Sequence, residues 1–220
     1  MHTIVMVTQK GGTGKSTIAI ALAVAAMQDG HRVALIEADP QGTVSKWCGR
    51  RSNPDPSVYS VGNATEIEQL LASLVEEDFT LAVIDTAATK NHLSGIAISV
   101  ADLCLIPARP STADIEAALP TLSMIRRLNK RFAFVLNQTP ARSYRLSEAA
   151  TLLNSLGVLA LPYIVLRNDH LDALGAGLAV TEFAPEGKAS EEIRGLWNWA
   201  WRQLTAELLE DQQAAIRAAV

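Results

Sequence analysis

A glycine-rich stretch near the start of the chain constrains the fold more than any other feature. Residues 9–17 read QKGGTGKST, after an apolar run over 3–8 and before an Ala-rich helical pattern over 18–28. Glycines let backbone N–H groups converge on an anion, and the N-terminus of the following helix adds partial positive charge. The segment therefore predicts a strand, a phosphate-binding loop and a helix, in that order.

The residue types in this loop suit a nucleoside triphosphate with Mg²⁺. Lys15 is placed to reach the β- and γ-phosphates, and the Ser16 hydroxyl is placed to coordinate the metal. The strict motif G-x-x-x-x-G-K-[ST] requires glycine at position 9, where this chain has Gln9, and a second lysine, Lys10, precedes the double glycine. We expect the nucleotide to be held by Gly11, Gly12, Thr13, Gly14, Lys15, Ser16 and Thr17.

Composition indicates one folded domain over residues 1–220, because 49% of the 220 residues are hydrophobic and 19% are charged. The net charge of −4 argues against a constitutively basic nucleic-acid binder, although it leaves room for a local basic patch. Cys48 and Cys104 have no paired spacing, so we expect buried free thiols. The chain begins in a strand pattern and has no apolar run of 18 residues, from which we expect a cytoplasmic protein without a spanning helix.

Apolar runs alternate with amphipathic segments along the whole chain. Several runs, such as 81–84 and 103–106, are apolar at consecutive positions, which is typical of parallel strands buried on both faces. This pattern predicts a doubly wound α/β fold with a mostly parallel sheet, helices on both faces and the architecture of a P-loop NTPase. The expected strands are 2–8, 32–37, 58–61, 80–85, 103–107, 132–137 and 158–163, and the expected helices are 15–29, 43–50, 64–77, 92–101, 111–129, 143–156 and 189–215.

Two helical segments carry further expectations. Pro120 lies inside the segment 111–129 and should kink or split it. The last segment places apolar residues on one stripe at helical spacing, and we expect this stripe to pack on the core, with docking on a membrane surface as the alternative. The stripe consists of Ile193, Leu196, Trp197, Ala200, Trp201, Leu204 and Leu208.

Polar residues follow three of the expected strands. Asp39 follows the strand 32–37 in the sequence EADPQG, Asp85 ends the run LAVID, and Asn137 ends the strand 132–137. Side chains at the carboxyl ends of parallel strands face the ligand crevice of such a sheet. The hydrophobic run that ends in Asp85 is typical of a carboxylate that holds Mg²⁺, directly or through water.

The loop has the form K-G-G-x-G-K-[ST]-T, the deviant Walker A motif, and it resembles that of the ParA and MinD ATPases and the nitrogenase iron protein. The resemblance implies ATP and Mg²⁺ as cofactors. It implies that Asp39 orients the attacking water and that Asn137 contacts adenine. It gives Lys10 a catalytic role beside Lys15 and Asp39, because the first lysine of this motif reaches the nucleotide of the partner subunit. The ATP-bound form should therefore be a homodimer.

Among these relatives the chain looks most like a small ParA partition ATPase that lacks an N-terminal helix-turn-helix. The sequence DPQG at 39–42 and the stretches 167–177 and 182–193 carry this likeness, and no C-x-x-C motif supports an iron–sulfur relative. The likeness implies slow ATP hydrolysis triggered by a ParB-like adaptor, nucleoid association and ATP-dependent, sequence-independent DNA binding. The candidate DNA contacts are Arg142, Arg145, Arg167, Lys188 and Arg194.

Three functions remain open from the sequence. The first is a partition or cargo-positioning ATPase that binds DNA. The second is a MinD-like positioning ATPase on a membrane surface, which would use the Trp-rich last helix. The third is an ATP-dependent metabolic enzyme, such as a ligase, on the same fold.

Overall fold

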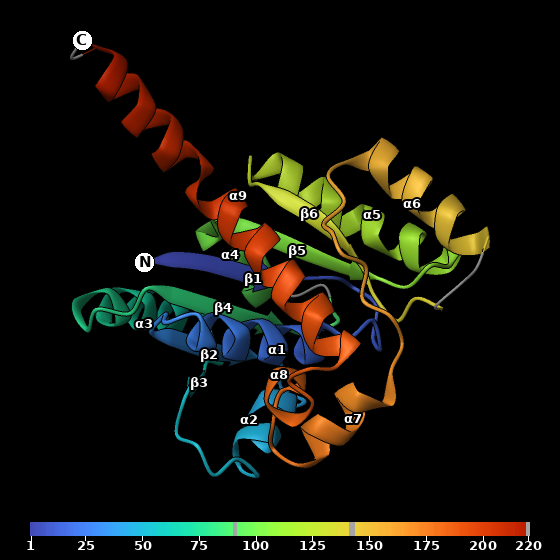
Figure 1. Ribbon diagram of the computed structural model, residues 1–220. Helices are drawn as coiled ribbons and strands as arrows, with labels where there is room; N and C mark the ends of the chain where they lie inside the picture. Colours follow the sequence, from blue (N-terminus) through green and yellow to red (C-terminus); the bar gives the residue numbers. More distant parts are fainter. Residues whose placement is uncertain (90–91, 141–143, 219–220) are drawn as a thin grey trace.

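The computed structural model describes residues 1–89, 92–140 and 144–218. Its centre is a six-stranded parallel sheet with the strand order β3-β2-β4-β1-β5-β6 (Figure 1). Every strand pair is parallel, so the carboxyl ends of the strands meet at one edge, where ligands bind in sheets of this kind. The strands are β1 (His2–Met6), β2 (Val33–Ala38), β3 (Ser57–Ser60), β4 (Leu81–Thr86), β5 (Leu103–Ala108) and β6 (Phe132–Leu136).

Both faces of the sheet are buried, which explains the consecutive apolar residues of its strands. In β1, Ile4 and Met6 belong to one hydrophobic cluster, while Val5 belongs to the other. Alternate side chains of a strand point to opposite faces, so a strand covered on both sides must be apolar throughout. The expected doubly wound fold is confirmed.

Helices cover the sheet in two layers (Figure 1). One layer contains α1 (Lys15–Gln28), α2 (Thr43–Cys48), α7 (Asn168–Gly175), α8 (Val180–Phe183) and α9 (Lys188–Ala218). The other contains α3 (Ala64–Glu76), α4 (His92–Val100), α5 (Thr112–Arg127) and α6 (Tyr144–Leu156). Cys104 is buried and Cys48 partly buried, and both thiols are free.

The structure corrects the secondary-structure expectations at the C-terminal edge. The expected seventh strand over 158–163 is wrong, because only single bridges form, between Leu159 and Phe134 and between Val165 and Thr139. Pro162 has no N–H with which to continue such a ladder. The helices α7 and α8 were not expected. Pro120 does not split α5, which runs unbroken through it. Glu116, whose carbonyl loses its usual partner there, is an exposed residue.

The first turns of α9 pack on the sheet as the apolar stripe predicts. Ile193, Leu196, Ala200 and Leu204 are buried, and the Trp197 indole donates a 2.9 Å hydrogen bond to Asp29 Oδ2. Core packing is therefore confirmed for this part of the stripe, and the side chain of Leu208 lies outside the described residues. The last turns of α9 extend away from the body of the protein (Figure 1). Among the described residues, no helix is both long and apolar enough to cross a membrane.

Candidate functional site

The glycine-rich loop connects β1 to α1 at the carboxyl edge of the sheet and has the backbone of an anion-binding loop. Gly12 and Gly14 have φ angles of 74° and 90°, a left-handed conformation that favours glycine. A Cβ atom on Gly14 would also lie 2.2 Å from Asn137 Nδ2. Gly14 caps α1 without a side-chain hydrogen bond, which leaves the N–H groups of the first turn available to a phosphate.

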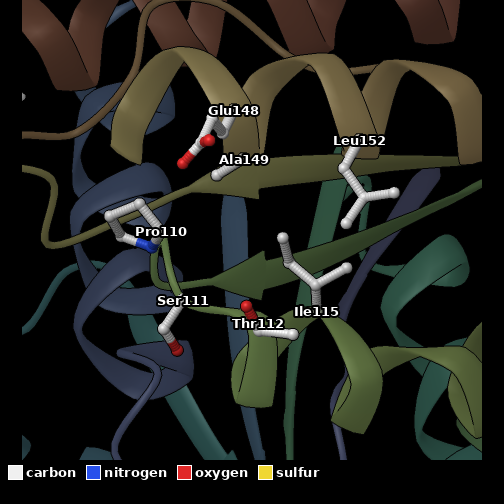
Figure 2. Close-up of a pocket in the computed structure, with 7 residues that line it drawn as sticks. All are labelled: Pro110, Ser111, Thr112, Ile115, Glu148, Ala149 and Leu152. Carbon is white, nitrogen blue, oxygen red and sulfur yellow. The ribbon is translucent and has the colours of Figure 1, made fainter. Parts of the chain in front are cut away.

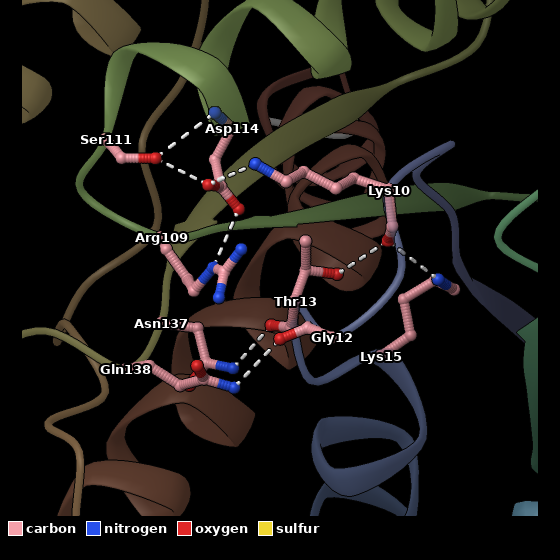
Figure 3. A network of polar contacts seen from close by, with 9 residues as sticks. All are labelled: Lys10, Gly12, Thr13, Lys15, Arg109, Ser111, Asp114, Asn137 and Gln138. Atoms are coloured by element: carbon pink, nitrogen blue, oxygen red, sulfur yellow. Dashed lines mark hydrogen bonds and ion pairs between the residues drawn. The ribbon is translucent and has the colours of Figure 1, made fainter.

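Side chains from the end of β6 hold the loop in place. Asn137 Nδ2 donates to the carbonyl of Thr13 at 2.7 Å, and Gln138 Nε2 donates to the carbonyl of Gly12 at 3.1 Å (Figure 3). Asn137 is buried, so its amide is a fixed part of the loop's support. Its contact with adenine stays a prediction, and anchoring of the loop is a role that the sequence did not indicate.

Lys15 is buried inside the loop, near the carboxylates of Asp85 and Asp39. The residue is 6% exposed, and Nζ donates a long 3.4 Å hydrogen bond to the carbonyl of Lys10. Burial lowers the pKa of Lys15, whereas the carboxylates of Asp85 and Asp39 raise it. A buried ammonium with one weak hydrogen bond gains most from an anionic ligand, as a phosphate-binding lysine does.

Asp85 offers two carboxylate oxygens for a metal ion. It is fully buried at the end of β4, and neither oxygen accepts a hydrogen bond of ordinary geometry within the described residues. Burial raises the pKa of Asp85 to about 7; the nearby hydroxyl of Ser16 and the ammonium of Lys15 lower it, while Glu37 and Asp39 raise it further. A bound cation would stabilise the charged form of the Asp85 carboxylate, which burial disfavours.

The donor set suits Mg²⁺ in a nucleotide site. In the described part of the chain, no three His, Cys, Asp or Glu side chains form a metal cluster. Magnesium in such sites takes one or two protein oxygens and otherwise phosphate oxygens and water, and Asp85 with Ser16 supplies that number.

Two further carboxylates end β2. Asp39 is half-buried, and its Oδ1 accepts a 2.9 Å hydrogen bond from the N–H of Gln41, which leaves the second oxygen free of the turn. Glu37 is buried, with Oε2 accepting from the N–H of Ser45 at 2.9 Å and Oε1 without a partner in the described residues. Burial raises the pKa of Glu37, and the backbone N–H groups of Ser45 and Val44 oppose that rise.

Lys10 points away from the phosphate site and is held by Asp114 at the start of α5. Lys10 Nζ lies 2.7 Å from Asp114 Oδ2, and Arg109 Nε lies 2.9 Å from Asp114 Oδ1 (Figure 3). The Asp114 side chain is only 2% exposed, whereas that of Lys10 is 27% exposed. Burial raises the pKa of Asp114, but the hydrogen bonds from Arg109, Lys10 and Ser111 outweigh it, and the net shift is downward.

Sequence reasoning missed Asp114, and the reason lies in its local pattern. Ser111 caps α5 and Asp114 stands three residues later, which is the ordinary capping arrangement of a helix start. The contact with Lys10 joins residues 104 positions apart. A local pattern that already explains a residue gives no reason to assign it a distant partner.

A pocket adjoins the loop beside Gly14. It measures about 230 Å³ and lies between the start of α1, the end of β6, the segment 164–167 and the first turn of α7. Gly14, Thr17 and Asn137 face it from the loop side, and Arg167 and His170 line its far wall. A nucleotide whose phosphates occupy the loop would reach this pocket with its base.

A second hollow of about 460 Å³ lies between the start of α5 and α6 (Figure 2). Ile115, Ala149 and Leu152 supply its apolar part, and Glu148 stands at its edge. Ser111 lines this groove and also donates to Asp114, so the groove adjoins the contact that holds Lys10.

The candidate DNA contacts differ in their surroundings. Lys188 and Arg194 are exposed at the start of α9, where Arg194 Nη2 donates to the carbonyl of Pro185 at 2.6 Å. Arg167 is half-buried, pairs with Glu192 at 2.6 Å and lines the pocket beside the loop, which makes it a poor candidate for a DNA contact. Arg142 and the side chain of Arg145 lie outside the described residues.

Comparisons with known proteins agree with this site. Residues 4–180 match the family model described as the CobQ/CobB/MinD/ParA nucleotide binding domain. The chain is 30% identical over 208 residues to the maintenance of carboxysome distribution protein A of Halothiobacillus neapolitanus, covering 89% of this chain and 94% of the relative. It is 24% identical over 176 residues to the protein ParA of Rhizobium radiobacter, covering 74% and 78%.

Among solved structures, the cell division ATPase MinD of Pyrococcus furiosus has the same fold. It aligns with a TM-score of 0.77 at 19% identity and covers 91% of this chain and 98% of MinD. The loop geometry, the family match and the relatives agree: the chain belongs to the CobQ/CobB/MinD/ParA family of nucleotide-binding domains and resembles its small ParA-type members.

Proposed function

We propose that this protein is a ParA-like positioning ATPase. It binds Mg²⁺-ATP, forms a homodimer in that state, binds DNA without sequence preference in the nucleoid and moves a DNA or protein cargo in the cytoplasm. A ParB-like adaptor on the cargo triggers hydrolysis, which is slow without it. The observation that carries this proposal is the division between the two lysines of the loop. Lys15 is enclosed in the phosphate site, while the Lys10 ammonium lies outside it against Asp114.

The different positions of the two lysines indicate different roles. Lys15, the loop N–H groups and the start of α1 bind the phosphates of the subunit's own nucleotide. The Lys10 side chain is partly exposed, and within the described residues its ammonium pairs with Asp114, while its backbone carbonyl accepts from Lys15. It can therefore serve a nucleotide bound to a second subunit, so that ATP joins the two.

Hydrolysis needs a positioned water and neutralised phosphate charge more than it needs covalent chemistry. Asp39, with one oxygen fixed by the turn and one free, orients the water. Asp85 and Ser16 would hold Mg²⁺, which would neutralise phosphate charge. Lys15 stabilises the charge that develops on the transferred group.

DNA binding in this proposal uses exposed cations that the dimer doubles. Lys188 and Arg194 are both exposed on the first turns of α9. Sequence-independent affinity grows steeply with the number of phosphates that are neutralised. A chain with a net charge of −4 can thus gain affinity for DNA when two copies present their patches together.

The test compares two single substitutions at the loop. Lys15→Gln should reduce ATP affinity by at least about tenfold, because a charge-assisted hydrogen bond is lost in a buried site. Lys10→Gln should retain ATP affinity within a few-fold and lose the ATP-dependent dimer. Calorimetry gives the affinities, and light scattering with ATP or ADP gives the dimer. An intact ATP dimer in Lys10→Gln would refute the role of Lys10 across the interface.

A further inference from the structure

Helix α2 begins without the side chain that usually caps a helix. Its N-cap position is Gly42, which has a φ angle of 66° and makes no side-chain hydrogen bond to the first turn. The N–H groups of a first helical turn have no partner within the helix, so they need an acceptor from elsewhere. For α2 this acceptor lies on the strand before it.

Glu37, near the end of β2, supplies the missing acceptor. Its Oε2 accepts a 2.9 Å hydrogen bond from the N–H of Ser45. Burial raises the pKa of Glu37, and the N–H groups of Ser45 and Val44 lower it, so both N–H groups lie against the carboxylate. Val44 and Ser45 are the second and third residues of α2, whose N–H groups a capping side chain normally binds.

The main chain of Glu37 is itself fixed inside the sheet. Glu37 pairs in register with Asp85 of β4 on one side and with Ser60 of β3 on the other. Its carbonyl accepts a 2.9 Å hydrogen bond from the N–H of Val61, and the residue is only 4% exposed. A side chain that starts from an inner strand has a precise position, so the Glu37 carboxylate fixes the start of α2 relative to β2.

The turn between β2 and α2 carries Asp39. Within it, Asp39 Oδ1 accepts from the N–H of Gln41 at 2.9 Å, and the carbonyl of Asp39 accepts from the N–H of Gly42 at 3.0 Å. Lys46 Nζ, on α2, donates to the carbonyl of Gln41 at 2.8 Å. The turn is thus bonded to α2, and the position of Asp39 depends on where α2 lies relative to β2.

We propose that Glu37 is a positioning residue for ATP hydrolysis: its carboxylate caps α2 and thereby holds the turn in which Asp39 orients the attacking water. The inference rests on the proposed function, because it acts through the role of Asp39 in that reaction. A displacement of about 1 Å in a reacting group can slow an enzyme about 10²-fold, so the cap controls the rate through Asp39.

Hydrogen exchange of the Val44 and Ser45 amides, resolved by NMR without nucleotide, tests the cap. Glu37→Met has a side chain of similar length without a carboxylate, and both amides should exchange at least about tenfold faster than in the wild type, the effect of one hydrogen bond to a charged group. Glu37→Gln keeps a carbonyl acceptor and should recover part of the protection. Ser60→Ala, which removes the 3.1 Å contact between the Ser60 and Ser45 hydroxyls, is the matched control and should leave both amides protected. Equal exchange rates in the wild type and Glu37→Met would show that Glu37 does not cap α2.

Basal phosphate release at saturating Mg²⁺-ATP tests the connection to Asp39. Glu37→Met should lower the turnover about 10- to 100-fold, because the water-orienting carboxylate loses its fixed position. Its ATP affinity should stay within about threefold of the wild type, since the phosphate loop is unchanged. In the Asp39→Ala background the same substitution should slow turnover by no more than about twofold, because it acts through a side chain that is already absent. An equal loss of rate in both backgrounds would refute the positioning role.

A Mg²⁺ titration separates this role from a role in metal binding. The Mg²⁺ concentration for half-maximal turnover should be the same in the wild type and Glu37→Met. An increase of about tenfold or more would assign Glu37 to the surroundings of the metal ion and overturn the proposal. A wild-type protein that binds no ATP would refute the proposed function, and the exchange rates of Val44 and Ser45 would still decide whether Glu37 caps α2.

Discussion

Asp39 and Asp85 stand at the ends of neighbouring strands, yet their surroundings separate their chemistry. Asp85 is fully buried without a hydrogen-bond partner in the described residues, which suits a metal ion. Asp39 is half-buried, and one of its oxygens is fixed by the N–H of Gln41. A fixed, hydrated carboxylate at the mouth of the site suits the orientation of a water molecule.

This difference predicts the effect of substitutions at Asp39. Asp39→Asn and Asp39→Ala should both bind ATP and dimerise but hydrolyse it about 10²- to 10⁴-fold more slowly, because the water loses its carboxylate. Asn keeps an acceptor for Gln41 and should preserve the turn better than Ala. Phosphate release measured at saturating ATP tests this. Unchanged turnover in Asp39→Ala would assign the water to another group.

Asp114 is predicted to contribute stability that depends on pH. Asp114→Ala removes its hydrogen bonds with Lys10, Arg109 and Ser111 and should lower the free energy of unfolding by about 2–3 kcal/mol at pH 7. The folded-state pKa of Asp114 is lowered, so its stabilisation is full above the unfolded value near 3.9 and is lost as the pH falls through the folded value.

Urea unfolding of wild type and Asp114→Ala between pH 7 and pH 3 measures this effect. The gap between the two proteins should narrow below about pH 4. Asp172→Ala, at an exposed position in α7, is the matched control and should change stability by about 0.5 kcal/mol or less. A gap that stays constant with pH would mean that the charge of Asp114 is not the source of its stabilisation.

At the scale of elements, one ion pair joins the segment that follows α2 to α8. Both terminal nitrogens of Arg51 lie 2.7 Å from the carboxylate oxygens of Glu182, and the Arg51 side chain is 1% exposed. The guanidinium also lies 4.9 Å from the ring centre of Trp47. Because α2 follows the Asp39 turn and α8 follows α7, this pair connects the segment after α2 to the helices that follow the pocket wall.

Breaking this pair should therefore destabilise the fold strongly. Arg51→Met leaves the carboxylate of Glu182 without its ion-pair partner and should lower the free energy of unfolding by about 3 kcal/mol. Arg50→Met is the matched control, because the side chain of exposed Arg50 donates to the carbonyl of Leu174 and to no other described residue. It should lower the free energy of unfolding by about 1 kcal/mol or less. Thermal unfolding of the two variants measures these losses of stability. Equal losses in Arg51→Met and Arg50→Met would contradict the assigned role of Arg51.

At the scale of the whole molecule, the nucleotide site and the start of α9 should act together through the dimer. With Mg²⁺-ATP the protein should bind duplex DNA of any sequence, and with ADP this binding should weaken strongly. Arg194→Glu should weaken the ATP-dependent binding and reduce the salt slope by about two, one contact from each subunit. Arg127→Glu, an equal charge change at an exposed site in the last turn of α5, should have little effect.

Gel shifts across nucleotide states and salt concentrations measure these effects. Equal DNA binding with ATP and with ADP would contradict the role of the ATP-dependent dimer in DNA binding. Binding to liposomes instead of DNA would favour a MinD-like membrane function, and a requirement for a small-molecule co-substrate would favour a metabolic enzyme.

The sequence by itself determined the phosphate loop, the two-sided parallel sheet and the strand ends that carry Asp39 and Asp85. Each depends on short-range patterns: glycine spacing, runs of apolar residues, and acids that end such runs. The tertiary structure decided the rest. It paired Lys10 with Asp114 and Arg167 with Glu192, brought His170 to the pocket and replaced the expected last strand by single bridges. These features depend on contacts between residues far apart in the chain, and local patterns do not encode which distant side chains folding brings together.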